Sequence, residues 1–523
     1  MPPSVRVVSA TESAERDRVT IEKGTPSSVL MQRAGAAAAE EISRRFADRL
    51  ADGVQIFTGP GNNGGDGWIV AGALARTGIS VTVVETAQPR SPDAVAAKAA
   101  SIDLIKRTEA EAEHSVRRNA RTGVVVDALL GTGAQGEPRG AIAAAIDDIN
   151  RFRSEGARVA ALDVPSGLDA TTGRHAACVI ADSTFTFGGL KRGSLIARDC
   201  CGEIVVLDIG LDDSDGPESK RASSTETPWL IDGPWVRAHI PPIRFDAHKG
   251  TRKHLAIIGG GSGMPGAAVL ATRAALRSGI GLVRALVSKE SVAAIVGAVP
   301  SALISEWPAD KSAISKEIST WGNAIVIGPG LGKSAATRRL VEDVIGDSRI
   351  PVLLDADALN VFDGDVDALA RLLRGRPALV TPHVAEFSRL AGIPVQEVLD
   401  NRFDIGLPMA RTLGATVLLK GAPTVIFTPE GERYVSARGT AALGAGGSGD
   451  LLSGIAGTLL AQTGDGRVAA CCAAWVHGRA AEFCEYVRGT NLEDVLYALP
   501  RAWNEDEPPT RPPVLAELPA VAL

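Results

Sequence analysis

Glycine, amide and carboxylate residues with the types and spacing of a ligand site recur in the first half of the sequence. They form the segments GPGNNGGDG (59–67), GTGAQGE (131–137) and DVPSGLD (163–169), together with Asp127. Glycines let backbone N–H groups approach a bound group closely, and a helix start after such a loop offers free N–H groups to a phosphate. Polar side chains within the first glycine loop indicate a site that coordinates or reacts.

A second glycine loop, GAGGSGD (444–450), has residue types suited to phosphoryl transfer. Small residues at a helix start free backbone N–H groups that can stabilise a transferring phosphoryl group. Asp450 follows this loop and could take a proton from an attacking hydroxyl. A glycine loop followed by Asp is also a common helix cap, so the motif alone does not decide between the two.

The elements that must position these residues alternate between apolar strands and Ala-rich helices. A helix is expected over residues 27–50, with Pro26 before it. Short apolar runs, which suit strands buried on both faces of a parallel sheet, are VQIFTG (54–59), VTVVE (81–85), VVVDALLG (124–131), VAALDVPSG (159–167), HLAIIGG (254–260), AIVIGPG (324–330), VLLDADALN (352–360), ALVTPH (378–383) and TVLLKG (416–421). Both halves are therefore predicted to be α/β. Ligands of such sheets bind beyond the carboxyl ends of the strands, where the loops above lie.

Length and composition favour two globular domains. The chain has 523 residues, which exceeds what one core usually organises. A polar, Ser- and Pro-containing stretch between residues 211 and 245 places the boundary, giving domains at 1–222 and 223–503 and a loose Pro-rich tail at 504–523.

Charge and hydropathy exclude several classes of protein. The net charge is −6 and the basic residues are scattered, which disfavours nucleic acid as a partner. The sequence has no secretory signal pattern and no run of about 18 apolar residues, so no membrane partner is expected. The six cysteines have no CxxC spacing, and their two adjacent pairs suit neither a disulfide framework nor zinc. A reducing cytoplasm is the expected location.

The first loop also imitates a dinucleotide fingerprint, because Gly59, Gly61 and Gly64 fit GxGxxG. The alternative function is then hydride transfer. That motif is weak alone, and Asn62, Asn63 and Asp66 are polar where the fingerprint usually packs a helix tightly on the sheet.

LMQRAG (30–35), GPGNNGGDG, DALLGTG (127–133) and DVPSGLDATTG (163–173) appear in an order that resembles the NAD(P)H-hydrate epimerase family over most of residues 1–215. This resemblance implies a Rossmann-like domain. It implies a potassium ion held by Asn63, Asp127 and Ser166, whose oxygens suit a large hard cation. The implied substrate-binding residues are Asn62, Asn63, Gly64, Gly65, Asp66, Gly131, Thr132, Gly133, Ala134, Gln135, Gly136, Glu137 and Asp163. Asp163 would be the general acid/base, although it could instead merely cap its turn with Ser166.

In the second half, the order of IIGGGSGMPGAA (257–268), GPGLG (328–332), DADALN (355–360), TPHVAEFSRL (381–390), KGAPTV (420–425) and GAGGSGD resembles the ADP- or ATP-dependent NAD(P)H-hydrate dehydratases of the ribokinase-like group, over nearly all of residues 235–500. The resemblance implies that Ala267, Gly330, His383 and Asp450 contact the hydrated dinucleotide. It implies that the nucleotide is bound by Lys420, Gly421, Ala422, Pro423, Thr424 and Gly449. Asp450 would be the catalytic base, and Mg²⁺ is expected because phosphoryl transfer needs charge neutralisation.

The combined resemblance predicts a bifunctional repair enzyme that epimerises hydrated NAD(P)H and dehydrates its S form with ADP. The expected partners are NADHX or NADPHX, ADP, and further copies of the chain in a homo-oligomer. Two alternatives stay open: a ribokinase-like small-molecule kinase with a nucleotide-binding N-domain, and a binding protein without catalysis. ADP is preferred to ATP only through the family resemblance.

Overall fold

The computed structural model describes residues 4–114, 122–211, 227–307, 316, 318–346 and 348–521. It separates into two compact units, one of residues 4–227 and 508–521 and the other of residues 228–507, leaving out the undescribed chain ends. The expected boundary at residues 222 and 223 lies outside the described residues. No helix among the described residues is long and apolar enough to cross a membrane.

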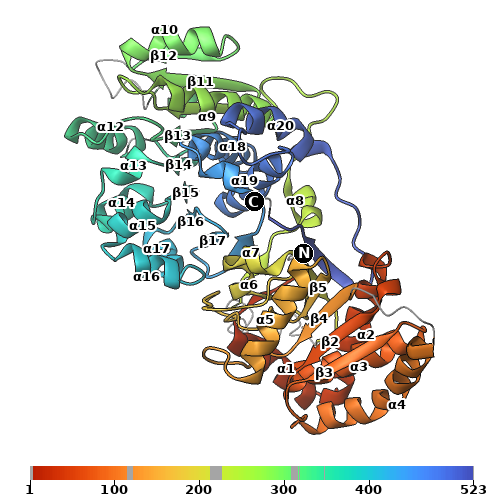
Figure 1. Cartoon of the computed structure of the whole chain (residues 1–523). Coiled ribbons are helices and arrows are strands. Elements are labelled where there is room, and N and C mark those ends of the chain that lie inside the picture. Colours follow the sequence, from red (N-terminus) through yellow and green to blue (C-terminus); the bar gives the residue numbers. More distant parts are fainter. Residues whose placement is uncertain are drawn as a thin grey trace. The chain divides into compact units, whose positions relative to one another are not determined.

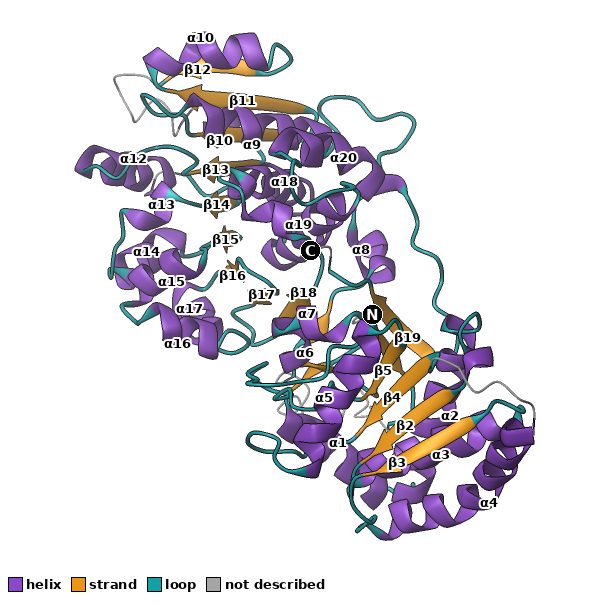
Figure 2. Ribbon diagram, viewed as in Figure 1, coloured by secondary structure: helices purple, strands orange, loops and turns teal. Residues whose placement is uncertain are grey.

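The first unit is an open, mostly parallel sheet with helices on both faces (Figures 1 and 2). Its described strands follow the order β19-β8-β6-β5-β4-β2-β3. They are β2 (Val54–Thr58), β3 (Val81–Glu85), β4 (Val124–Ala128), β5 (Arg158–Leu162), β6 (Ser183–Phe187), β8 (Glu203–Leu207) and β19 (Val514–Leu518), with a separate parallel pair, β1 (Val7–Val8) and β7 (Leu190–Lys191). The helices are α1 (Ala10–Glu22), α2 (Ser27–Arg45), α3 (Asn62–Arg76), α4 (Pro92–His114), α5 (Ala141–Ser154), α6 (Arg192–Ile196) and α7 (Arg198–Cys201), with a 3-10 turn, η1 (Leu50–Asp52).

Successive residues of the central strands enter two different cores. Ile56 and Val126 pack with α2 and α3 on one face of the sheet, whereas Phe57 and Val125 pack with α5 on the other. Because side chains alternate across a strand, burial on both faces requires the continuous apolar runs that the sequence contains.

Two expectations about the first unit need correction. The helix expected over 27–50 ends at Arg45, because Phe46, whose buried side chain continues the apolar spacing from Ile42, leaves helical geometry as the C-cap with φ −113°. The expected loose tail instead contains β19, which pairs antiparallel with β8. Its alternate residues Val514, Ala516 and Leu518 are buried, so this segment has the period-2 pattern of an edge strand despite its prolines.

The second unit is built on one large sheet with helices on both faces. Its described strand order is β12-β11-β10-β13-β14-β15-β16-β17-β18-β9. The strands are β9 (Trp229–Leu230), β10 (His254–Ile258), β11 (Leu282–Val287), β12 (Leu303–Glu306), β13 (Ala324–Ile327), β14 (Val352–Leu354), β15 (Ala378–Val380), β16 (Thr416–Leu419), β17 (Thr424–Phe427) and β18 (Arg433–Ser436). The pairs from β12 to β16 are parallel, whereas β17 is antiparallel to both of its neighbours.

The helices of the second unit are α8 (Gly233–His239), α9 (Pro265–Arg277), α10 (Lys289–Ala298), α12 (Ala335–Gly346), α13 (Asp357–Asn360), α14 (Val366–Leu373), α15 (Val384–Ala391), α16 (Val395–Asp400), α17 (Gly406–Leu413), α18 (Ser448–Thr463), α19 (Gly466–Glu482) and α20 (Leu492–Asn504), with a 3-10 turn, η2 (Ala441–Gly444). Helix α18 lies tightly on the sheet because it presents glycines to its neighbours. A Cβ on Gly457 would lie 2.3 Å from Val326 of β13, and one on Gly454 would lie 2.1 Å from the carbonyl oxygen of Ala271 in α9. These contacts fix the start of α18, where Asp450 lies.

Candidate active sites

The site of the first unit lies at the point where the strand order reverses. Strand β2 pairs with β3 on one side and β4 on the other, and the glycine loops follow β2 and β4 at their carboxyl ends. Such a switch point is where open α/β sheets bind ligands. A Cβ on Gly59 would lie 1.8 Å from the carbonyl oxygen of Leu129, so glycine is required for the two loops to meet.

The first glycine loop becomes the first turn of α3, which contains Asn62, Asn63, Gly64, Gly65 and Asp66. The structure brings this turn close to the loop after β4 and to Asp163. A Cβ on Gly131 would lie 3.3 Å from the Cβ of Asn63 and 3.4 Å from Oδ2 of Asp163. The backbone N–H of Thr132 donates to that Oδ2 at 3.3 Å.

Asp163 is held in place by strained backbone and by a buried lysine. Its φ of 65° is in the left-handed region, which is uncommon for a residue with a side chain and is found at functional sites. Its Oδ1 lies 2.6 Å from Nζ of Lys191, whose side chain is 1% exposed. Two further carboxylates, those of Asp66 and Asp17, lie near this pair. Burial, followed by the charge of Asp163, raises the pKa of Asp66 well above its ordinary value. Burial also raises the pKa of Asp17.

The three oxygen donors expected to hold a cation are connected to one another. Ser166 donates to Asp127 through both its backbone N–H, at 2.7 Å, and its hydroxyl, at 2.6 Å. Nδ2 of Asn63 donates to the carbonyl oxygen of Leu130 at 2.9 Å, and the Leu130 N–H donates to Oγ of Ser166. Oδ1 of Asn63 is buried without a hydrogen-bond partner among the described residues. Burial raises the pKa of Asp127 to about 6, because the surroundings do not fully compensate its charge.

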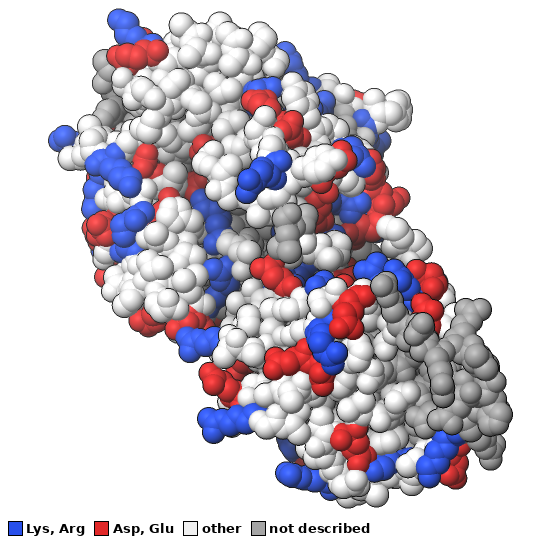
Figure 3. Space-filling view, viewed as in Figure 1, with Lys and Arg blue, Asp and Glu red and all other residues white. Residues whose placement is uncertain are grey.

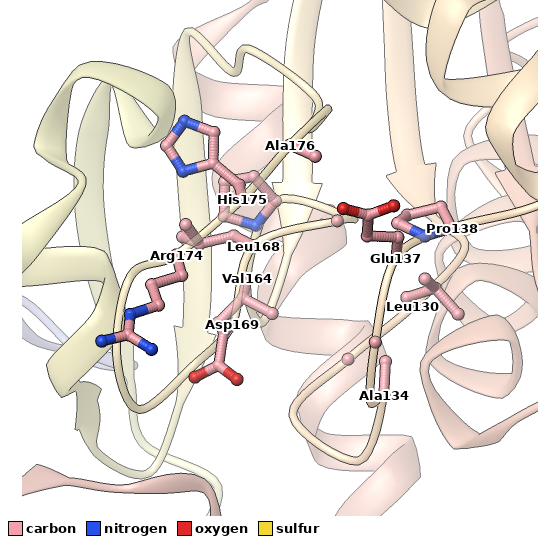
Figure 4. Close-up of a pocket in the computed structure, with 14 residues that line it drawn as sticks. Leu130, Ala134, Glu137, Pro138, Val164, Leu168, Asp169, Arg174, His175 and Ala176 are labelled. Atoms are coloured by element: carbon pink, nitrogen blue, oxygen red, sulfur yellow. The ribbon is translucent and has the colours of Figure 1, made fainter.

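A pocket of about 350 Å³ lies beside this site (Figure 4). Gly131 and Gly136 help to line it, and Figure 4 shows Ala134 and Glu137 on one side with Arg174 and His175 on the opposite side. Thr132, Gly133 and Gln135 belong to the same half-exposed or exposed loop but do not line the pocket, and neither does Asp163.

The site of the second unit gathers residues from the ends of five adjacent strands. The order β10-β13-β14-β15-β16 brings together the segments that follow these strands. Gly330 follows β13 and meets Ala267 of α9: a Cβ on Gly330 would lie 3.0 Å from the Cβ of Ala267. His383 follows β15 and forms an isolated parallel bridge with Lys420, which follows β16.

Lys420 is the centre of a buried ionic group. Its Nζ lies 2.7 Å from Oδ1 of Asp355, the residue that follows β14, and 3.8 Å from Oε2 of Glu386. The Asp355 side chain is 2% exposed, and its Oδ2 accepts a hydrogen bond from Ser453 of α18 at 2.6 Å. Burial alone lowers the pKa of Lys420, but the charges of Asp355 and Glu386 outweigh it and raise that pKa above its usual value.

Gly449 and Asp450 lie in the first turn of α18, next to this ionic group. A Cβ on Gly449 would lie 3.1 Å from Nζ of Lys420 and 3.6 Å from Oδ2 of Asp355, so a glycine lets the helix start approach the lysine. Burial, followed by the charge of Asp355, raises the pKa of the half-buried Asp450 to about 7. A carboxylate with a pKa near neutrality can exchange protons at physiological pH, as a general base must.

The remaining predicted residues occupy the loop and helix start near Lys420. Gly421, Ala422 and Pro423 connect β16 to β17, which begins at Thr424, and Gly421 and Ala422 are exposed. His383 is the N-cap of α15, where its Nδ1 accepts a hydrogen bond from the Ala385 N–H at 3.1 Å. His383 thus has a structural role whether or not it also contacts a ligand.

Both halves match known families. Residues 27–193 match the profile described as YjeF-related protein N-terminus, and residues 255–501 match the profile described as NAD(P)H-hydrate dehydratase. The bifunctional NAD(P)H-hydrate repair enzyme Nnr of Escherichia coli (strain K12) is 36% identical over 488 residues, covering 91% of this chain and 90% of that protein. The enzyme of the same name from Moorella thermoacetica is 34% identical over 506 residues, covering 92% and 93%.

The chain belongs to the bifunctional NAD(P)H-hydrate repair enzymes. Membership confirms the predicted pairing of an epimerase half with a dehydratase half and supports it over the small-molecule kinase. Among solved structures, the ADP/ATP-dependent NAD(P)H-hydrate dehydratase of Bacillus subtilis, co-crystallised with ATP and Mg²⁺, is 31% identical, covers 52% of this chain and 97% of its own, and has a TM-score of 0.47.

Four charged residues of this repair enzyme were missed by the sequence analysis: Lys191, Asp17, Asp355 and Glu386. Asp355 and Glu386 lie within motifs that carried the family resemblance, and their positions directly after β14 and in the first turn of α15 were available as signals. Lys191 could have been found as a lone cation in the apolar segment FTFGGLK (185–191). Asp17 lies in α1, far from the motifs in sequence, and no pattern marks it.

Proposed function

We propose that the second unit dehydrates the S form of NAD(P)HX with ADP as phosphoryl donor, and that Asp450 is its base. The observation that carries this proposal is the position of the Asp450 carboxylate at the start of α18, beside Lys420 and Asp355. Helix N–H groups and the lysine ammonium are the groups that stabilise the charge of a transferring phosphoryl group.

In the proposed reaction, Asp450 takes the proton of the C6 hydroxyl while the hydroxyl oxygen attacks the terminal phosphorus of ADP. The bond from that phosphorus to the bridging oxygen breaks, and AMP leaves. The C6–O bond then breaks with release of phosphate, assisted by the ring nitrogen, and loss of the C5 proton restores the dihydropyridine. In this unit Ala267, Gly330 and His383 would contact the dinucleotide, and Lys420–Thr424 with Gly449 would hold ADP.

Mg²⁺ is part of this proposal because hard oxygen donors converge near Asp450. The charges of Asp355, Asp357 and Glu386 all raise its pKa, which means that several carboxylates lie within electrostatic reach of one another. Carboxylates and nucleotide phosphates are the ligands that Mg²⁺ prefers. A bound Mg²⁺ would neutralise part of the phosphate charge.

For the first unit, we propose epimerisation at C6 by Asp163 and its neighbours. Asp163, paired with Lys191, would accept a proton, and Asp66, whose pKa burial raises well above its ordinary value, would donate one. The C6–O bond breaks and re-forms on the other face of the ring between these groups. The glycine loops at 62–66 and 131–137 would hold the substrate.

Potassium fits the oxygens of Asn63, Asp127 and Ser166. The unpartnered Oδ1 of Asn63 and the buried carboxylate of Asp127 are the donors that a large hard cation accepts. A potassium ion there would supply a fixed positive charge beside the substrate.

All six cysteines are free thiols, which supports a reducing, cytoplasmic location. A homo-oligomer is also proposed, and light scattering on the purified protein tests it.

One assay tests both activities. The R and S forms of hydrated NADH are supplied separately, with ADP or ATP and with potassium varied. We expect the S form to yield NADH and phosphate in equal amounts, and the R form to do so only after epimerisation. Asp163→Asn should leave the R form unconsumed, and Asp450→Asn should abolish NADH formation while R and S still interconvert. A stable phosphorylated product would show a kinase instead.

A further inference from the structure

Two cysteines and a histidine that are separated in sequence meet in the first unit. Sγ of Cys178 lies 3.2 Å from Sγ of Cys200, which in turn lies 3.5 Å from Nε2 of His175. All three donor atoms lie within 4.8 Å of one another. His175 and Cys178 belong to the loop between β5 and β6, and Cys200 belongs to α7.

The histidine ring has a defined orientation toward this group. Its Nδ1 lies 3.0 Å from the carbonyl oxygen of Gly173, to which it can donate its proton. The lone pair of Nε2 is then directed at the cysteines. A ring N–H that donates to a backbone carbonyl is the usual support of a metal-binding histidine, because it fixes both tautomer and orientation.

The exposure of these three residues also suits a metal site, whereas packing alone would not require an exposed histidine beside two buried cysteines. Residues Cys178 and Cys200 are 5% and 4% exposed, whereas His175 is exposed to solvent. An ion could therefore enter from the histidine side and be shielded by the two sulfur atoms.

We propose that His175, Cys178 and Cys200 bind one divalent cation of the zinc class, through Nε2 and two thiolates, with a fourth position open to solvent. Imidazole and thiolate ligands select borderline-soft ions over the hard ions of the two active sites. Zinc bonds of about 2.3 Å to sulfur and about 2.0 Å to nitrogen in a tetrahedron place S and N about 3.5 Å apart and two S atoms about 3.8 Å apart. The S–N separation is already present between Cys200 and His175, Cys178 lies within 4.8 Å of the same nitrogen, and the two sulfurs must part by about half an ångström.

A disulfide between Cys178 and Cys200 is the competing use of the same thiols. It would give no role to Nε2 of His175 or to the hydrogen bond that orients the ring. The metal site also explains why the spacing along the sequence did not reveal it: the donors come from a loop and a helix 22 residues apart, so only the fold brings them together.

His175 connects the proposed metal site to the pocket in Figure 4, because Arg174, His175 and Ala176 form part of its wall. A cation would fix this wall relative to α7. The proposal itself is independent of the proposed epimerase activity, because its test needs no substrate.

The test uses the reduced, full-length protein freed of metal by chelator and titrated with Co²⁺, which reports thiolate ligation by charge-transfer absorption. We expect one Co²⁺ per chain with the spectrum of a tetrahedral thiolate site, displaced by one equivalent of Zn²⁺. Cys200→Ser and His175→Ala should weaken binding at least about 100-fold, because even the outer partners of a metal site commonly contribute 10- to 100-fold. Cys484→Ser, at a half-buried thiol of the second unit, should bind as the wild type does.

A second measurement on the unmodified protein covers the case in which a variant does not fold. The alkylation rate of Cys178 and Cys200, read by mass spectrometry, should fall when Zn²⁺ is added. The absence of a thiolate band together with unchanged alkylation would overturn the proposal. So would rapid formation of a Cys178–Cys200 disulfide by a mild oxidant in protein that takes up no Co²⁺ when reduced.

Discussion

Asp450 carries its charge at a cost to the folded state. Its pKa in the folded chain is about 7 against an ordinary value of 3.8, chiefly because of burial. The folded chain therefore holds this proton more tightly than the unfolded chain, so its stability falls as the pH rises from about 3.8 to about 7. The same carboxylate must be ionised to act as a base, so activity should rise over the upper part of this range.

We predict that Asp450→Asn loses about 100- to 10,000-fold in dehydratase rate, the usual contribution of a general base. At pH 8 the variant should be more stable than the wild type, by up to about 4 kcal/mol, because each pKa unit corresponds to about 1.4 kcal/mol. Near pH 4 the two proteins should be equally stable. Urea unfolding at both pH values and the pH profile of kcat/KM measure these effects. Equal stability at pH 8 would show that Asp450 is not buried as described.

Lys191 should be needed for epimerisation, although it lies outside the sequence motifs. Lys191→Met leaves Asp163 buried beside Asp66 without its cation, and breaking a buried pair by removing one partner typically costs about 3–5 kcal/mol. We expect epimerisation to fall sharply while dehydration of the S form continues. Lys98→Met, which removes the more exposed ion pair with Glu85, is the matched control and should leave both activities unchanged. Epimerisation at the wild-type rate in Lys191→Met would show that the epimerase site does not need Lys191.

Single residues were predictable where a motif fixed them. Asp127, Asp163 and Lys420 each lie in or directly after a strand, and the fold places them at the carboxyl ends of their strands as expected. Their roles stay predictions. Lys191 had only its place in an apolar segment as a signal and Asp17 had none, since the fold alone brings their partners to them.

At the scale of elements, the helix α18 depends on glycines that the sequence analysis did not interpret. Beyond the glycine loop at 444–450, Gly454 and Gly457 are helical glycines that let α18 contact α9 and β13. Glycine in a helix is ordinarily destabilising, so close packing explains its presence. The positions of the strand cores were predicted well, whereas the ends extended too far, because the predicted runs included the first residues of the loops, as in VLLDADALN beyond Leu354.

We predict that Gly454→Ala destabilises the second unit by about 1–3 kcal/mol, because the added methyl group would meet the backbone of Ala271. Gly297→Ala in α10 is the control: nothing lies within 4 Å of its added Cβ, so it should stabilise by about 0.5–1 kcal/mol. Urea unfolding monitored by circular dichroism measures both. Equal effects of the two substitutions would contradict the packing described for α18.

In the molecule as a whole, two separate stretches of the chain form the first unit. The chain leaves this unit after residue 227 and returns to it at residue 508, where β19 pairs with β8 at the edge of the sheet. Composition misled the sequence analysis here, because prolines before Val514 suggested a loose tail, although the alternation in VLAEL (514–518) was visible. Acidic and basic side chains are interspersed on the face shown in Figure 3, where the described residues do not gather into one basic patch.

We predict that ending the chain after Glu507 spares the dehydratase and impairs the epimerase. The truncation removes three buried apolar residues and exposes the edge of β8, which favours aggregation. Thermal unfolding with light scattering, and both activity assays, measure the result. Glu517→Gln is the control, since it keeps the strand and removes only the ion pairs with Arg44 and Arg45, each worth about 1 kcal/mol or less where exposed. Full epimerase activity in the truncated protein would show that β19 is dispensable.

The return of β19 has a consequence for how the protein is made. During synthesis, domains generally fold from the N-terminus as the chain emerges. Here the outermost strand of the first sheet is translated about 300 residues after β8, behind the entire second unit. Until then the nascent first unit exposes the edge of β8, a longer-lived edge than in a chain whose strands are contiguous.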